Sequence, residues 1–175
     1  MCSYLDKHNY EFGKEALRII RSPGLQQILA PESGYFPDDI NEWLKTPYEK
    51  SQEYPEHLIY PTLKGDMVRS KSEMIIAHEL FTHKIPYRYE CRLDLGYDYY
   101  FPDYTILHPE ARFILLWEHF GMMHDELYVK KAARKIKTYV ENGYIPGRNL
   151  IMTFESENHP FDYKEVLDII NRLLL

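Results

Sequence analysis

Hydrophobic and polar residues follow two different periods in the region after residue 66. Apolar residues recur at helical spacing over 70–84, where Ser70 or Ser72 supplies an N-cap and Pro86 stops the pattern. The chain then alternates strictly between apolar and polar residues over 87–95, which predicts a strand with one buried and one exposed face. We therefore expect a helix followed directly by a half-exposed strand.

Two more strands are predicted before residue 118. After a turn over 96–102, residues 103–107 predict a second strand, and residues 108–111 predict a tight return. Residues 113–117 are apolar on both faces, which is typical of a buried central strand. The pattern predicts three consecutive strands in a meander.

The C-terminal part of the sequence predicts two helices around one further strand. Apolar residues form a stripe along a basic helix over 125–141, which the Asn-Gly pair at 142–143 ends. Residues 150–154 predict a fourth strand, and residues 163–174 predict an amphipathic helix. From residue 70 the expected order is helix, three strands, helix, strand, helix, which is an α/β fold.

The first 65 residues differ from the remainder in charge and in pattern. Residues 1–57 hold ten acidic and six basic side chains, and so carry most of the formal net charge of -6. Helical spacing predicts a short helix over 12–20 and a second helix that begins at Asp38 or Asp39. An extended connector is predicted over 54–65. We therefore expect a helical and extended N-terminal extension (1–65) packed on a core domain (66–175).

The amino-acid composition argues against several classes of protein. The acidic balance, with a pI near 5.7, argues against a polycation that binds nucleic acid by bulk electrostatics, so any such contact must be local. Cys2 and Cys91 are too few for a disulfide framework and suit a reducing compartment. The longest apolar run is far shorter than the roughly 20 residues of a membrane-spanning helix, and the N-terminus lacks a signal-peptide pattern. We expect a cytoplasmic protein without a membrane partner.

Three carboxylates are the strongest candidates for chemistry. Asp103 begins the second predicted strand, Glu118 follows the buried central strand, and Glu73 lies in the first turn of the preceding helix. If the two strands pair through their short return, Asp103 and Glu118 become neighbours. Two adjacent acids repel each other, and a hard divalent cation that prefers oxygen ligands relieves this repulsion. The sequence therefore predicts a Mg²⁺ or Mn²⁺ site.

Each of these acids also has a structural interpretation. A Pro-Asp pair such as the one ending at Asp103 is common in turns. Glu73 suits the first turn of any helix because of the helix dipole. Glu118 is harder to explain in this way, because a carboxylate at the end of a buried strand needs a cation, hydrogen-bond donors or a proton.

The element order and the three acids resemble the PD-(D/E)XK nuclease superfamily over residues 68–155. The resemblance implies a restriction-endonuclease-like core with Asp103 and Glu118 as metal ligands. It further implies that Glu73 reaches the metal through water and that the backbone carbonyl of His119 is another ligand. The implied activity is hydrolysis of phosphodiester bonds in nucleic acid by a metal-activated water, with DNA favoured over RNA as the substrate.

The chain departs from this family at its third motif. Where the family has Glu-x-Lys, residues 118–120 read Glu-His-Phe. Lys131, Lys135 and Tyr139 lie on one stripe of the predicted basic helix, at i, i+4 and i+8. The resemblance implies that a lysine moved to this helix can orient the attacking water or offset phosphate charge. Lys135 and Tyr139 also resemble the Gln-x-x-x-Tyr element of recombination-type exonucleases.

Several alternatives stay open at this stage. Without a replacement lysine, the chain would be an inactive nuclease-fold module that binds nucleic acid or a protein. The acidic N-terminal region could dock on a protein partner, or its aromatic residues Trp43, Tyr48 and Tyr54 could only pack against the core. A homodimer is a further alternative. The candidate contacts to nucleic acid are Arg69, Lys71 and Arg134. Arg69 and Lys71 could instead only pair with acids such as Glu90 and Asp94, and Arg134 could lie on a solvated helix face.

Overall fold

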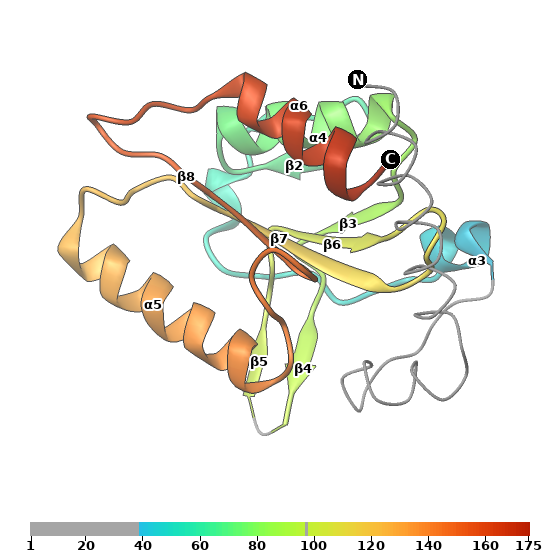
Figure 1. Ribbon diagram of the computed structural model, residues 1–175, viewed down its shortest axis with the longest axis horizontal. Coiled ribbons are helices and arrows are strands. Elements are labelled where there is room, and N and C mark those ends of the chain that lie inside the picture. The colour runs from blue at the N-terminus through green and yellow to red at the C-terminus, as the bar shows by residue number, and fades with distance from the viewer. Residues whose placement is uncertain (1–38, 97) are drawn as a thin grey trace, which may run out of the picture. The chain divides into compact units, whose positions relative to one another are not determined.

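The computed structural model describes residues 39–96 and 98–175, which lie within one compact unit, Tyr35–Leu175. A central four-stranded sheet runs through this unit, with helices on both of its faces (Figure 1). The predicted α/β class is confirmed. The first predicted helix, over 12–20, lies outside the described residues.

The central sheet combines three antiparallel strands with one parallel strand. Its strands are β3 (Tyr87–Tyr89), β6 (Tyr104–Leu107), β7 (Ile114–Phe120) and β8 (Leu150–Phe154). They lie in the order β3-β6-β7-β8, and only β7 and β8 run parallel. A parallel neighbour needs a crossover connection, which helix α5 (Glu126–Glu141) supplies. The last three of these strands match the predicted ones.

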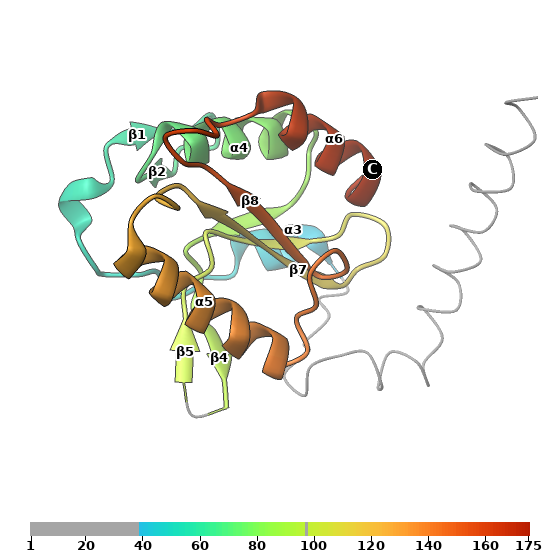
Figure 2. The ribbon, with the colours of Figure 1, turned by 60° about the vertical axis from the view of Figure 1, so that its left-hand side comes forward.

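Helices pack on both faces of the sheet and explain why β7 is apolar on both sides. Helices α4 (Lys71–Thr82) and α6 (Tyr163–Leu173) cover one face, and α5 covers the other (Figure 1 and Figure 2). Leu115 and Trp117 of β7 join the core under α4 and α6, whereas Leu116 joins the core under α5. The predicted positions of these three helices are confirmed.

The prediction of one continuous strand over 87–95 is wrong, because the chain leaves the central sheet after β3. Glu90 has a positive φ of 44°, which ends the extended conformation. Its carboxylate forms an ion pair with Arg69, 21 residues earlier in the chain. This partner is distant in sequence, so the alternating pattern gave no sign of the break.

A separate hairpin follows the break and replaces the turn that was predicted over 96–102. Strand β4 (Leu93–Leu95) pairs antiparallel with β5 (Asp98–Tyr100), with Gly96 at a positive φ of 69° between them. The prediction of a plain turn is therefore wrong. The hairpin lies below the central sheet in Figure 1, beside α5. Its Tyr100 packs against Tyr139 of α5 with ring centroids 5.7 Å apart.

The described residues before α4 form short elements rather than a plain extended connector. Helix α3 (Ile40–Lys45) begins after Asp39, whose side chain caps it as predicted. A 3-10 turn, η1 (Pro55–His57), and a hairpin of β1 (Tyr60–Pro61) and β2 (Met67–Val68) follow. The extended connector predicted over 54–65 is therefore only partly right, because local hydrogen bonds organise it.

Candidate active site

Strands β6 and β7 bring Asp103 and Glu118 to the same end of the sheet. Tyr104 pairs with Trp117, so continuing this antiparallel register by one residue places Asp103 opposite Glu118. Oδ2 of Asp103 accepts a hydrogen bond of 2.6 Å from the backbone N–H of His119. The predicted pairing of the two strands is thus confirmed, and it makes these two acids neighbours.

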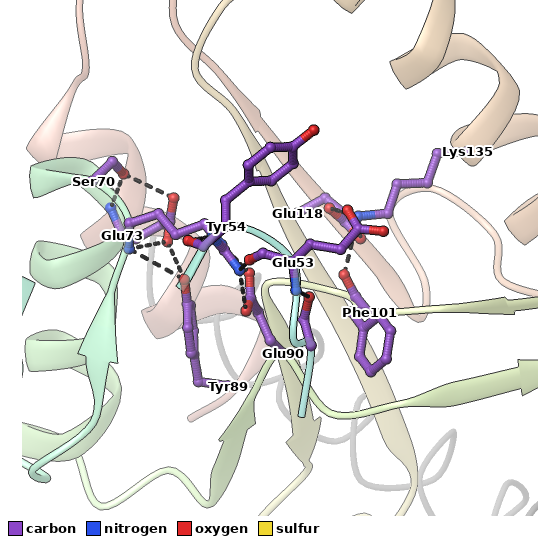
Figure 3. Close-up of polar contacts among 11 residues, drawn as sticks. Glu53, Tyr54, Ser70, Glu73, Tyr89, Glu90, Phe101, Glu118 and Lys135 are labelled. Carbon is purple, nitrogen blue, oxygen red and sulfur yellow. Dashed lines mark hydrogen bonds and ion pairs between the residues drawn. The ribbon is translucent and has the colours of Figure 1, made fainter. Parts of the chain in front are cut away.

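Glu118 is held by two side chains from helix α5. Its side chain is only 3% exposed, and Nζ of Lys135 lies 2.8 Å from each of its carboxylate oxygens (Figure 3). The Tyr139 hydroxyl donates a 2.6 Å hydrogen bond to Oε1. Nζ of Lys135 also donates to the backbone carbonyl of Phe101, at 3.2 Å. The buried carboxylate therefore has the cation and the donor that its burial requires.

Negative charge exceeds positive charge at this end of the sheet. Burial raises the pKa of Asp103 well above its usual range, and the charges of Glu118 and Glu73 raise it further. Burial opposes the charge of Lys135, but the Glu118 and Asp103 carboxylates outweigh this effect and raise the lysine pKa. One ammonium thus faces several carboxylates, and the charges of two of them act on Asp103.

Glu73 lies in the first turn of α4, where donors from its own helix terminus and from β3 hold it. Oε2 accepts hydrogen bonds from the backbone N–H of Arg69 at 3.1 Å and from the Tyr89 hydroxyl at 2.7 Å. The other oxygen, Oε1, accepts from Ser70 at 3.0 Å. Glu73 therefore acts on Asp103 through its charge, while its own oxygens bond to the chain.

The Ser70 cap gives a direct test of how α4 holds Glu73. The hydroxyl of Ser70 accepts from the Glu73 N–H at 3.1 Å and donates to the Glu73 carboxylate. We expect Ser70→Ala to lower stability by about 1 kcal/mol, because both bonds are lost. Thermal unfolding should then shift by about 2–4 °C, whereas Ser70→Thr, which keeps the hydroxyl, should stay close to the unchanged protein. Equal unfolding temperatures for the alanine and threonine variants would show that the cap contributes nothing.

The donor set suits a hard cation bound through few protein ligands. Within residues 39–96 and 98–175, no three or more His, Cys, Asp or Glu side chains are grouped closely enough to enclose a metal ion. Mg²⁺ commonly uses only one or two carboxylates and retains several waters. Asp103 offers such a carboxylate, since only its Oδ2 accepts a hydrogen bond from the described part of the chain. Asp103 therefore has an open carboxylate oxygen for such an ion, whereas Lys135 and Tyr139 already contact both oxygens of Glu118.

The two candidate lysines on α5 have different environments. Lys135 reaches Glu118, whereas Lys131 is exposed and its side chain forms no hydrogen bond or ion pair with any described residue. Tyr128 lies seven residues before Lys135 on the same side of the helix. Burial raises the pKa of Tyr128, and the charges of Asp103 and Glu118 raise it further. The Tyr128 hydroxyl therefore lies within the electric field of the two acids. Tyr128 is not among the residues predicted from the sequence, although it lies at i, i+7 to Lys135.

The three candidate contacts to nucleic acid also differ from one another. Lys71 and Arg134 are exposed on α4 and α5. Arg69 is instead bound to the chain, because its guanidinium donates to both carboxylate oxygens of Glu90, at 2.5 and 3.0 Å. The same guanidinium donates to the backbone carbonyls of Glu53 and Tyr54 (Figure 3). Arg69 thus organises the segment in front of α4.

The ring of His119 anchors the strand end that binds Asp103. Its Nε2 lies 3.2 Å from a Glu155 carboxylate oxygen, and its Nδ1 lies 3.0 Å from the Thr153 hydroxyl. A carboxylate only accepts hydrogen bonds, so the neutral ring carries its proton on Nε2 and accepts at Nδ1. Burial lowers the pKa of His119 and favours this neutral form. His119 lies opposite Thr153 in the register of β7 and β8.

Comparison with known proteins gives no relative. No family model, no curated protein and no solved structure matches this chain. Among the helices of the described residues, none has the length and apolar character needed to cross a membrane. The function must therefore be inferred from the geometry and charge of the site.

Proposed function

We propose that this protein is a metal-dependent nuclease of the PD-(D/E)XK type that hydrolyses phosphodiester bonds in nucleic acid, with DNA as the favoured substrate. One observation carries the proposal: Lys135 of the crossover helix places its ammonium on Glu118, beside Asp103. An ammonium at the acid pair is what the missing lysine of the Glu-x-Lys motif would supply. The order α4, β3, β6, β7, α5, β8 supports a restriction-endonuclease-like core.

Asp103 and Glu118 would hold Mg²⁺ or Mn²⁺. When bound, such an ion lowers the pKa of water in its coordination shell and offsets the charge of the scissile phosphate. In hydrolysis, a water oxygen forms a bond to phosphorus, one phosphorus–ester oxygen bond breaks, and the leaving oxygen takes up a proton. The backbone N–H of His119 fixes Asp103 in position for this role.

Lys135 and Tyr139 would serve different purposes in the reaction. The Lys135 ammonium can stabilise the charge that develops on the phosphate oxygens, because the Glu118 carboxylate already holds it in position. Tyr139, which is fully buried, orients Glu118 through its hydroxyl. Tyr139 is therefore a positioning residue, and Lys135 would be a catalytic residue.

A specific observation also favours an inactive module as the second candidate. Both carboxylate oxygens of Glu118 are already engaged, by Lys135 and by Tyr139. If this arrangement persisted in the presence of a divalent ion, Glu118 could not bind the metal. The chain would then bind nucleic acid or a protein without cutting it.

The deciding experiment is cleavage of end-labelled single-stranded and double-stranded DNA and RNA in Mg²⁺ or Mn²⁺, with EDTA as the blank. We expect products that require the ion and that disappear in Asp103→Asn. Asp168→Asn, which changes an exposed carboxylate on α6, should cut like the unchanged protein. The absence of products from folded protein with all four substrates would reject the nuclease and favour the inactive module. Products that persist in Asp103→Asn would reject the site.

A further inference from the structure

Tyr54 exposes an aromatic ring that the fold does not need for packing. Its side chain is 62% exposed, whereas Trp43 is only 7% exposed. The Arg88 guanidinium packs over Trp43 and over Tyr48, at 4.4 and 4.8 Å from their ring centroids. The hypothesis that all three aromatic residues only pack against the core therefore suits Trp43 and Tyr48, but it does not explain Tyr54.

The exposed ring forms a flat pair with His57. The ring centroids of Tyr54 and His57 lie 5.5 Å apart, and their planes differ by only 12°. Both residues are exposed, so the pair presents a parallel aromatic surface to solvent. Such a surface can extend its stack by one more flat group of similar size.

The backbone under Tyr54 is fixed by a residue that also contacts the candidate site. Tyr54 has a positive φ of 46°, an unusual conformation for a bulky residue. Arg69 holds it there, because its Nη1 donates a 2.8 Å hydrogen bond to the Tyr54 carbonyl and its Nη2 donates a 2.6 Å hydrogen bond to the Glu53 carbonyl. The backbone N–H of Arg69 donates to Glu73, which acts electrostatically on Asp103.

We infer that Tyr54 and His57 form a stacking site for one unpaired base of a single-stranded nucleic acid. The inference rests on the proposed function and specifies its substrate class. Aromatic side chains bind single strands by stacking on bases, whereas a base in an intact duplex presents no free face. The exposed acids Glu53 and Glu56 flank the pair and repel phosphate, so the base rather than the backbone is the group that fits here.

The inference is tested by steady-state cleavage of a single-stranded oligonucleotide in Mg²⁺ by the full chain. We expect Tyr54→Ala to raise KM about 5- to 150-fold, the factor that corresponds to one lost base stack, with kcat nearly unchanged. Tyr54→Trp should retain the low KM because it preserves the stack. A 2-aminopurine base in the oligonucleotide should lose fluorescence on binding to the unchanged protein and to Tyr54→Trp, but not to Tyr54→Ala.

Tyr163→Ala, which removes another exposed tyrosine on α6, is the matched control and should leave KM unchanged. If the unchanged protein cuts a single strand and Tyr54→Ala has the same KM, the stacking site is wrong while the nuclease stands. Cleavage confined to a blunt duplex would also overturn the stacking site alone. If the unchanged protein cuts neither form, the proposed function and this inference fail together.

Discussion

Asp103→Asn is expected to stabilise the metal-free protein while it abolishes cleavage. The carboxylate of Asp103 is repelled by Glu118 and Glu73 and loses solvation on folding. The isosteric amide removes this cost, and every kcal/mol of repulsion removed should raise the unfolding temperature by about 2–4 °C. Loss of a direct metal ligand should lower the cleavage rate by at least about 100-fold. Mutation of a residue that only hydrogen-bonds to a metal ligand already lowers metal affinity or activity by about 10- to 100-fold.

The stability difference should depend on pH in a defined direction. Because the pKa of Asp103 is raised in the folded protein, the folded state binds its proton more tightly than the unfolded chain does. The favourable contribution of this group is therefore full below its unfolded pKa of about 3.9 and is lost as pH rises through the folded value. The amide of the Asp103→Asn variant does not titrate. The stability of the variant should therefore exceed that of the unchanged protein most at neutral pH and least in acid.

Thermal unfolding in EDTA between acid and neutral pH checks this prediction. Addition of Mg²⁺ should then raise the unfolding temperature of the unchanged protein but not that of Asp103→Asn, because only the former keeps the ligand. Asp168→Asn on α6 again serves as the control and should follow the unchanged protein at every pH. An Asp103→Asn variant that is less stable than the unchanged protein at neutral pH would show that the carboxylate is structural.

Lys135→Met should lower both stability and cleavage, the reverse of the stability effect at Asp103. The substitution leaves Glu118 buried with only Tyr139 as its partner. Breaking one side of a buried ion pair costs about 3 kcal/mol or more, which corresponds to a fall of about 6–12 °C in the unfolding temperature. The loss of a preorganised charge at the phosphate should lower kcat by about 100- to 1,000-fold.

Lys131→Met is the matched control, because it removes an exposed lysine one turn away on the same helix. It should leave unfolding and kcat almost unchanged. The double variant Glu118→Gln with Lys135→Met should recover part of the lost stability, with a coupling of about 1–3 kcal/mol, since it leaves neither partner as an unpaired charge. If Lys131→Met lost activity and Lys135→Met kept it, the assignment of the replacement lysine would be wrong.

The sequence predicted the elements whose signals are local. Helices α4, α5 and α6 follow from apolar spacing and capping residues, and β7 follows from a run that is apolar on both faces. The neighbouring positions of Asp103 and Glu118 also followed, because a short return fixes the register of β6 and β7. These predictions depend on contacts between residues that are close in the chain.

The tertiary structure decided which of two similar candidate lysines contacts the acid pair. Lys131 and Lys135 have the same charge and lie on the same helix, but only the packing of α5 against the sheet places Lys135 on Glu118. Arg69 binds the carboxylate of Glu90, where the strand breaks, and the backbone carbonyl of Tyr54, and so joins segments 15 to 21 residues apart. Periodicity reports which face of an element is apolar, whereas an ion pair between distant segments depends on how the elements pack. The chain therefore determined its elements and its acid pair locally, and long-range packing selected the lysine and the exposed ring.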